Sequence, residues 1–412
     1  MSDQALETKL AAADIAVLTG GRDKHYSLGL AVALRERGIS FEFLGSDLID
    51  APELHDSPLI TYRNLRGDQS ENAPAHQKVV RVLRYYGRLI TYAVLSRPTV
   101  FHVLWNNKFE WFDRTILMGL YRLCGRKVVF TAHNVNIGER DGRDSPMNRL
   151  TLAIQYRLAS AIFVHTEQMS RQLQDVFHVP VNKIQVIPFP LNNAVPDTVM
   201  DGSTARASLG IGPEEKVLLF YGQVAPYKGL EYLVQSLVHL RKSDTPYRLL
   251  IAGRIKKNAE NYWKEIQETI SRSDLASLIL SRIEFIPDED TEIYFKAADV
   301  LVLPYVYIFQ SGVLFLSYNF GLPVLAADVG SLKENIVEGR TGFVFPPKDP
   351  VSLARTIEGF FDSDLYRNLP DRRKDIRGLA SQNNSWNTVA SSTIQVYDQL
   401  INSRVKERLQ RS

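Results

Sequence analysis

Two short glycine-bearing turns carry the residue types best suited to holding an anion. The first, YGQVAPYKG, runs from Tyr221 to Gly229, after the apolar stretch KVLLF and before an amphipathic helical pattern. Backbone N–H groups at the start of a helix, together with the helix dipole, favour negative charge. Lys228 adds a compact positive charge that suits a phosphate. A lysine in an ordinary strand-to-helix turn explains this segment equally well.

The second turn, FQSGV, runs from Phe309 to Val313 between an apolar stretch and a short helical pattern. Ser311 is a candidate N-cap, and the amides of Gly312 and Val313 are placed to receive a diphosphate. Taken alone, simple helix capping is the preferred interpretation. Gly20 and Gly21 follow the first apolar stretch, but GGRDKH does not match the spaced-glycine dinucleotide fingerprint.

His133 ends the strand-like stretch VVFTAHN, where a histidine can donate a hydrogen bond to a hydroxyl or titrate. A lone histidine is more often structural. The acidic run Asp288-Glu289-Asp290 resembles a metal-binding pair, yet it opens a helical pattern, which favours a capping role. No metal-ligand spacing and no nucleophile–base pair stands out, so the sequence predicts no metal and no cofactor.

Composition sets further limits on function. The chain has 412 residues and a formal net charge of +3, which is too balanced to predict a nucleic-acid partner. A single cysteine, Cys124, excludes a disulfide framework and suits a reducing cytosol. The first residues are acidic where a signal peptide would be basic, so none is predicted. Polar residues, prolines and glycines interrupt the uncharged stretch 300–327, which favours buried strands and a short helix over a membrane span.

One segment is unusually basic. Residues 72–109 contain no Asp or Glu, and within them HQKVVRVLRYYGRLITYAVLSR has a helical pattern. Arg81, Arg84 and Arg88 fall at i, i+3 and i+7, on one side of that helix. A basic amphipathic helix can lie on an anionic membrane surface. A surface helix packed on its sheet with a solvated face is the alternative.

The chain repeats one pattern twice. Strand-like apolar stretches alternate with helical patterns up to SAIFVHTE, and the alternation restarts at KVLLF, which predicts two α/β domains with parallel sheets. The Pro/Asn-rich segment 184–210 reads as a linker. We therefore expect an N-terminal domain, residues 1–191, and a C-terminal domain, residues 192–385. Ligands of such sheets sit at the carboxyl ends of the strands, so we expect the chemistry in a cleft between the domains.

Together these passages resemble the retaining glycosyltransferases of family 4, which have the GT-B fold. The resemblance is carried by FYGQVAPYKGLEYLVQSL, YFKAADVLVLPY, QSGVLFLSYNFGLPVLAADVGSLKENI and GRTGFVFPPKD, with VVFTAHNVNIGERD and FVHTEQM before them. It covers nearly the whole chain and is nearest to bacterial enzymes of exopolysaccharide and lipid-linked glycan assembly. It implies two Rossmann-like domains that face each other across a cleft, with a terminal helix, about 386–402, returning to the first domain.

The resemblance also implies roles for individual residues. Lys228 would contact the donor diphosphate in a turn shaped by Gly222 and Gly229, and His133 would face the donor sugar. The first-domain glycine loop and the phosphate-side turn would contribute Gly20, Gly21, Gln310, Ser311, Gly312 and Val313. Glu334 would lie near the nucleotide ribose, although an acid in a first helical turn has an equally good structural explanation.

Two departures from the family pattern concern the donor site. Gln223 stands where many relatives have an arginine, so one cation is missing unless Arg254 replaces it. The usual pair of glutamates spaced by seven residues is absent, and Ile308 and Leu316 occupy those positions. Both departures bear on recognition of the sugar and the ribose.

The resemblance predicts a cytoplasmic, metal-independent hexosyltransferase. It would move a hexose from a UDP- or GDP-sugar to a hydroxyl of a lipid-linked or oligosaccharide acceptor with retention of configuration. The alternative is a catalytically silent GT-B-like subunit that binds a partner transferase or a glycan. The basic stripe would place either protein at the inner face of the membrane.

Overall fold

The computed structural model describes residues 14–409, apart from 22, 71–72, 193–194 and 242–244. The first 13 residues, on which part of the signal-peptide prediction depends, lie outside this range. The chain divides into two compact units. The first comprises Met1–Pro188 and Trp386–Ser412, and the second is Phe189–Ser385. The division lies three residues before the expected boundary after residue 191.

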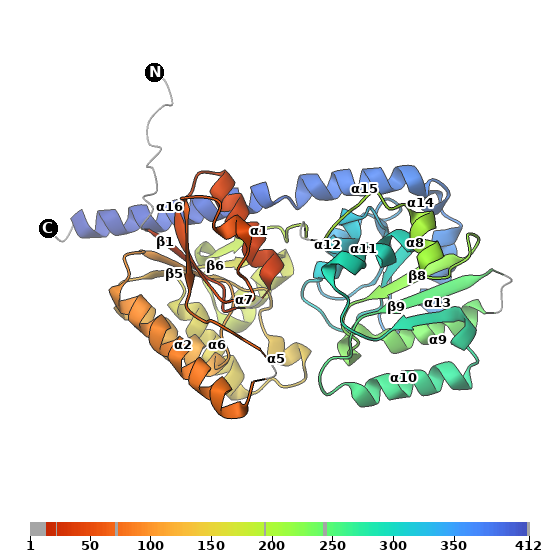
Figure 1. Cartoon of the computed structure of the whole chain (residues 1–412), viewed down its shortest axis with the longest axis horizontal. Helices are drawn as coiled ribbons and strands as arrows, with labels where there is room; N and C mark the ends of the chain where they lie inside the picture. The colour runs from red at the N-terminus through yellow and green to blue at the C-terminus, as the bar shows by residue number, and fades with distance from the viewer. Residues whose placement is uncertain (1–13, 22, 71–72, 193–194, 242–244, 410–412) are drawn as a thin grey trace, which may run out of the picture. The chain divides into compact units, whose positions relative to one another are not determined.

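The first unit is built on a seven-stranded parallel sheet (Figure 1). Its order is β3-β2-β1-β4-β5-β6-β7. The central strands each have four consecutive buried residues, as expected for a parallel sheet covered on both faces. The strands are β1 (Ile15–Leu18), β2 (Phe41–Gly45), β3 (Ile60–Asn64), β4 (Val100–Val103), β5 (Lys127–Thr131), β6 (Ala161–Val164) and β7 (Ile184–Val186).

Helices connect these strands in the βαβ manner. Several begin at a residue whose side chain accepts a hydrogen bond from the first turn, including Ser145 before α6 and Thr166 before α7. The helical elements of this unit are α1 (Lys24–Glu36), η1 (Pro52–Leu54), α2 (Ala75–Leu95), α3 (Glu110–Phe112), η2 (Asp113–Leu117), α4 (Met118–Leu123), α5 (Ile137–Arg140), α6 (Pro146–Leu158), α7 (Glu167–Phe177), η3 (Val181–Lys183) and α16 (Trp386–Leu409).

The terminal helix α16 packs on α1 and β4 within the first unit. A Cβ atom on Gly29 of α1 would overlap the Trp386 ring, so this close approach needs glycine. Deeper in the core, the Tyr397 hydroxyl lies 2.6 Å from Nδ1 of His102, and Nε2 of His102 lies 2.7 Å from the Thr131 hydroxyl. The last helix therefore completes the core of the first unit.

The second unit has a six-stranded parallel sheet with the order β10-β9-β8-β11-β12-β13. Its strands are β8 (Lys216–Tyr221), β9 (Tyr247–Ala252), β10 (Ile279–Arg282), β11 (Val300–Leu303), β12 (Val324–Ala327) and β13 (Gly342–Phe345). Its helical elements are α8 (Gly202–Ser208), η4 (Pro226–Lys228), α9 (Leu230–Leu240), α10 (Glu260–Arg272), η5 (Ala276–Leu278), α11 (Asp288–Ala297), α12 (Gly312–Asn319), η6 (Lys333–Asn335), α13 (Pro350–Phe361), α14 (Asp364–Arg367) and α15 (Leu369–Asn383).

Both sheets have the strand order of a Rossmann fold, with the direction of winding reversed after the third strand. The reversal places β1 beside β4 in the first unit and β8 beside β11 in the second. Loops after these paired strands leave the same sheet edge and diverge, and this is where doubly wound folds bind ligands. The expected α/β fold class with two Rossmann-like domains is thus confirmed.

One detail differs from the sequence prediction. The segment 184–210 is not a continuous linker, because it contains strand β7 and helix α8. The side chain of Asp201 accepts a hydrogen bond from the Thr204 amide, which starts α8 despite its weak apolar pattern. The uncharged stretch 300–327 consists of β11, α12 and β12, as expected. Among the described helices none has both the length and the apolar character to cross a bilayer.

Replacement of Tyr397 by Phe should destabilise the first unit. It removes the hydroxyl partner of a buried imidazole nitrogen, which typically costs about 1–3 kcal/mol. Urea unfolding followed by circular dichroism measures the loss. An unchanged midpoint would show that α16 does not depend on this contact for its attachment.

Candidate functional site

In the second unit, the loops after β8 and β11 are locked together at the carboxyl edge of the sheet. The Tyr227 carbonyl accepts a hydrogen bond from the Val306 amide at 2.9 Å. Gly229 has a φ of 64°, and a Cβ atom there would overlap the Pro304 carbonyl oxygen. Glycine is therefore required for the two loops to approach this closely.

Lys228 is directed into the space that these two loops enclose. It is only 6% exposed, and its Nζ lies 5.1 Å from the centre of the Tyr305 ring. Gly222 has a φ of 102°, and a Cβ atom on it would lie 2.9 Å from that Nζ and 3.7 Å from Cγ2 of Val313. Gly222, Lys228 and Val313 thus surround one small volume, although up to 91 residues separate them in the sequence.

Helix α12 starts beside this lysine. The amides of Gly312 and Val313 have no backbone or side-chain acceptor in the described part of the chain. Ser311 occupies the N-cap position, but its side chain caps no amide; its Oγ lies 3.4 Å from the Tyr305 hydroxyl. The side-chain capping considered for Ser311 is therefore wrong, and the helix start keeps its donors for another acceptor.

The loop after β12 supports the same turn. The Ser331 hydroxyl lies 2.5 Å from the Phe309 carbonyl oxygen and 2.6 Å from Oε1 of Gln310. These contacts orient Gln310 at the entrance to α12. Glu334 lies a few residues further on, exposed in the short helical turn η6. No sequence pattern pointed to Tyr305 or Ser331, because both act through contacts made only in the folded chain.

The two departures from the family pattern have different structural contexts. Ile308 and Leu316 are buried, 8% and 7% exposed, and belong to the hydrophobic core of the second unit. Gln223 is partly exposed in the turn. The Arg254 side chain lies over the Phe285 ring at 5.8 Å, while its carbonyl accepts a hydrogen bond from Val224. Arg254 is thus fixed to the turn through its backbone.

These groups form an anion-binding arrangement. A lysine and two helix-start amides converge on one edge, and amides and cations of this kind are what a diphosphate requires. Among the described residues no cluster of histidine, cysteine or carboxylate side chains could hold a metal ion. The acids Asp288, Glu289 and Asp290 form the first turn of α11, where they face the positive end of the helix dipole.

In the first unit, His133 lies at the carboxyl edge of the sheet, just after β5. Its ring stacks on Trp105, with centroids 4.2 Å apart and planes at 5°. Gly20, with a φ of 62°, precedes α1, and a Cβ atom on it would lie 2.7 Å from the Trp105 carbonyl oxygen. A Cβ atom on Gly21 would lie 2.7 Å from Cδ of Arg66. His133 and Gly20 therefore both contact Trp105. Trp105 was not among the site residues predicted from the sequence.

The three arginines of the predicted stripe on α2 do not share one environment in the structure. Arg81 forms an ion pair with Asp68 at 2.8 Å. Arg84 and Arg88 instead line a groove of about 1060 Å³ beside edge strand β3, together with Arg63 and Arg97. Glu42 is the acid in that lining, and it already pairs with Arg63 and accepts a hydrogen bond from Tyr92. The groove is therefore strongly basic.

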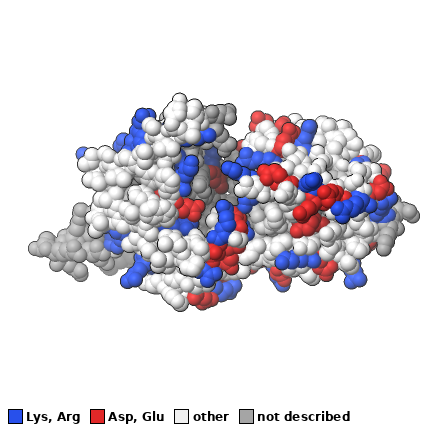
Figure 2. Space-filling view, turned by 90° about the horizontal axis from the view of Figure 1, so that it is seen from below, with Lys and Arg blue, Asp and Glu red and all other residues white. Residues whose placement is uncertain are grey.

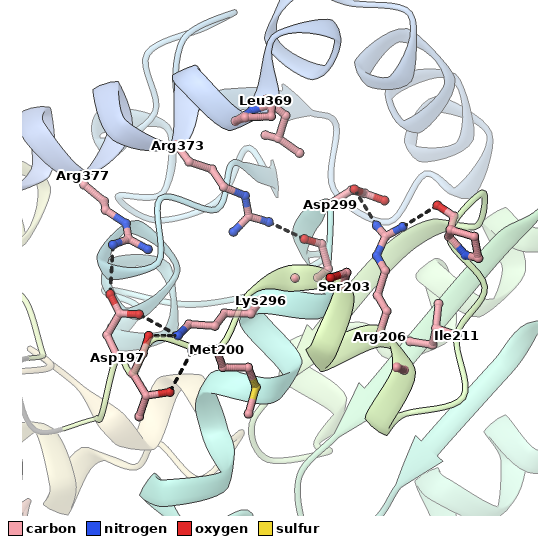
Figure 3. A pocket seen from close by; sticks show the side chains of 16 residues that line it. Asp197, Met200, Ser203, Arg206, Ile211, Lys296, Asp299, Leu369, Arg373 and Arg377 are labelled. Carbon is pink, nitrogen blue, oxygen red and sulfur yellow. Dashed lines mark hydrogen bonds and ion pairs between the residues drawn. The ribbon is translucent and has the colours of Figure 1, made fainter.

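A pocket of about 730 Å³ in the second unit is lined by charged side chains (Figure 3). Lys296 pairs with Glu292 at 2.7 Å and with Asp197 at 3.0 Å, and Arg377 also pairs with Asp197. Arg206 pairs with Asp299, directly before β11. This pocket lies at the amino ends of the strands, opposite the Lys228 edge. Arg373, in the same lining, donates to the Phe320 and Ala298 carbonyl oxygens.

Comparisons with known proteins agree with this geometry. Residues 25–193 match the family model Glycosyltransferase Family 4, and residues 215–363 match the model Glycosyl transferases group 1. The matches span most of both units. The chain is a GT-B glycosyltransferase of the family 4 and group 1 type.

Individual relatives are more distant. A D-inositol 3-phosphate glycosyltransferase of Pseudarthrobacter chlorophenolicus is 24% identical, over 92% of this chain and 90% of its own. The fold is similar to that of sucrose-phosphate synthase from Thermosynechococcus elongatus (TM-score 0.75, 19% identity, 95% and 100% of the two chains). It is also similar to that of Anabaena HepE, solved with UDP and glucose (TM-score 0.71, 17% identity, 94% and 100%).

Replacement of Lys296 by Met should destabilise the second unit by about 3–5 kcal/mol, because it leaves the buried Glu292 carboxylate without its cation. Nucleotide affinity should not change, since the pocket and the Lys228 edge lie at opposite ends of the strands. Thermal unfolding and nucleotide titration measure the two effects. Lys374→Met, which removes an exposed lysine on α15, is the control and should cost less than about 1 kcal/mol.

Proposed function

We propose that this glycosyltransferase moves a hexose from a nucleotide-diphosphate sugar, with UDP or GDP as the nucleotide, to a hydroxyl of a lipid-linked or oligosaccharide acceptor. In this proposal the transfer retains the anomeric configuration and needs no metal. The observation that carries it is the convergence of Lys228 with the unbonded amides of Gly312 and Val313. The name of the HepE structure, a complex of that protein with UDP and glucose, supports a donor of this class.

The physical task is to stabilise a leaving diphosphate, which gains negative charge as the glycosidic bond breaks. Lys228 and the two amides are held in position before the reaction, so they stabilise that charge without a cost of reorganisation. The departing phosphate itself takes the proton of the acceptor hydroxyl on the same face of the sugar. The proton offsets the negative charge that builds up on the departing phosphate. No side chain is needed as a nucleophile. The first unit, with Gly20, Gly21 and His133, would contribute contacts to the acceptor and to the transferred sugar.

Replacement of Lys228 by Met should lower kcat/KM for sugar transfer by about a hundred- to a thousandfold, as loss of one preorganised donor typically does. It should also weaken the binding of nucleoside diphosphates. A screen of UDP, GDP and their sugars by thermal shift, followed by transfer assays with the stabilising donor, measures both effects. The anomeric configuration of the product, read by NMR, tests retention.

Lys216→Met is a matched control. Lys216 begins the same strand, β8, and its Nζ lies 4.8 Å from the Phe361 ring centre, but it is at the opposite sheet edge. Its removal should leave transfer and nucleotide affinity unchanged. Equal activity of the Lys228 variant and the wild type would refute the site. A wild-type protein that neither binds nor turns over any nucleotide sugar would instead favour a catalytically silent partner subunit.

We also propose that helix α2 binds the anionic inner surface of the membrane. Its outer face carries large apolar side chains in water, among them Leu83 and Leu95, 63% and 76% exposed, along with Val79, Val80 and Val94. The basic groove with Arg84 and Arg88 lies beside them. Figure 2, which faces this side of the first unit, shows a largely uncharged surface with separate Lys and Arg side chains. Apolar side chains beside arginines suit the boundary between headgroups and acyl chains.

The double variant Arg84→Glu/Arg88→Glu should bind anionic vesicles at least about tenfold more weakly, because each arginine near such a surface contributes about 1 kcal/mol. Arg81→Glu should have a smaller effect, since Arg81 is already paired with Asp68. Flotation with phosphatidylglycerol vesicles measures binding. Lys264→Glu/Arg272→Glu on α10 of the second unit changes the charge equally and should bind like the wild type. Identical binding by all four proteins would exclude a membrane role for α2.

A further inference from the structure

The charged pocket of the second unit contains one arginine whose surroundings differ from those of its neighbours (Figure 3). Three cations of the lining are each paired with a carboxylate. Arg373, on α15, forms no ion pair within the described part of the chain, and its guanidinium donates instead to the carbonyl oxygens of Phe320 at 3.2 Å and Ala298 at 2.5 Å. Carbonyl oxygens orient a cation but do not neutralise it. Arg373 therefore keeps a positive charge with no carboxylate in contact.

The lining as a whole also carries more positive than negative charge. Its charged residues are four cations and two acids, namely Arg206, Lys296, Arg373, Arg377, Asp197 and Asp299. A third carboxylate, that of Glu292, pairs with Lys296 from outside the lining. Four cations thus meet three carboxylates, and one positive charge remains. Because buried charges in proteins are generally paired, an excess cation beside a cavity suits an anionic ligand.

Arg377, one helical turn further along α15, brings a second guanidinium close to that of Arg373. Both groups donate to the Phe320 carbonyl oxygen, Arg373 at 3.2 Å and Arg377 at 3.4 Å. Burial, the largest cause, lowers the pKa of Arg373 to about 10, although Asp299 acts in the opposite direction. The neighbouring charges of Arg377 and Arg206 contribute to the lowering. Arg373 stays charged at neutral pH, and an anion between the two guanidinium groups would relieve their repulsion.

The rest of the pocket suits an organic molecule. Its volume of about 730 Å³ lies within the usual range for small-molecule sites, about 300–1,000 Å³, and exceeds what one small ion needs. Sites for such ligands combine apolar walls with a few charged groups. Apolar side chains complete this lining, namely Met200, Ile211, Pro213, Leu369 and Pro370.

Two adjacent guanidinium groups favour a phosphate over a carboxylate. A carboxylate has two oxygens, which one guanidinium can occupy in a bidentate pair, whereas a phosphate monoester has three acceptor oxygens to share between two. We propose that this pocket is a second anion-binding site, which takes a small phosphorylated organic molecule with its phosphate on Arg373 and Arg377. The proposal does not depend on the proposed function, because the pocket lies at the amino ends of the strands and Lys228 lies at their carboxyl ends.

Isothermal titration of the full chain with glucose 6-phosphate tests the site. Lys228→Met serves as the parent protein, because it weakens the anion site at the other edge of the sheet. This parent should bind glucose 6-phosphate, with inorganic phosphate binding more weakly and glucose not at all. Adding Arg373→Gln should weaken the binding of glucose 6-phosphate at least about tenfold, as loss of a hydrogen bond between charged groups typically does. Unchanged affinity would overturn the proposal, and so would a parent protein that binds neither phosphate compound.

Two further variants of the same parent separate the site from general effects of charge and folding. Arg377→Gln changes a side chain that is 43% exposed, so the fold should tolerate it, and binding should weaken about threefold or more. Arg355→Gln, exposed on α13 outside the lining, removes the same charge and should bind like the parent. Equal weakening in these two variants would contradict the site. Inorganic phosphate that binds as tightly as glucose 6-phosphate would refute an organic ligand.

Discussion

In each unit, the geometry of the candidate site depends on close contact between a glycine and a backbone carbonyl oxygen. In the second unit a Cβ atom on Gly229 would overlap the Pro304 carbonyl oxygen, and in the first unit one on Gly20 would lie 2.7 Å from the Trp105 carbonyl oxygen. Each contact joins the loop after the first strand of a sheet to the loop after its fourth strand, where the winding reverses. Any larger residue would separate the loops. Lys228 would then lose its place beside Tyr305, and Trp105 its place beneath His133.

In the second unit, the charged side chains at the two ends of the strands have different surroundings. At the amino ends of the strands, Arg206, Lys296 and Arg377 are each paired with a carboxylate, which the burial of such groups requires. At the carboxyl ends, the cation lies against an aromatic ring, and two helix-start amides keep their hydrogens. Ion pairs therefore line the amino edge, while the carboxyl edge presents the helix-start amides of α12 close to Lys228.

Much of this architecture was predictable, because it depends on local patterns. Alternating strands and helices, the turns at Gly222 and Gly312, and helix α2 are all visible as periodicity or as glycine placement. The errors concern contacts between distant segments. The pairing of Arg81 with Asp68 divides the predicted stripe, and helix α8 depends on a cap from Asp201 rather than on its apolar pattern. Likewise, the contact between His165 and His133 exists only because β5 and β6 are neighbours in the sheet, which the sequence pattern does not show.

The chain crosses between the units twice, after Pro188 and before Trp386. In each unit, residues next to a crossing pack against residues of the candidate site. On the way out, the Ile187 amide donates a hydrogen bond to the Val164 carbonyl at 2.9 Å, and Phe189 stacks on Phe315 in α12, with ring centroids 5.3 Å apart. On the way back, Asn384 bonds the backbone of Phe189 and Leu191. Trp386 then packs edge-on against Tyr26, 5.3 Å away, which itself contacts His133. Because protein interiors are close-packed, a backbone rotation at either crossing acts directly on rings that hold a site residue. Within each unit, the residues next to a crossing are therefore part of the packing that supports a site residue.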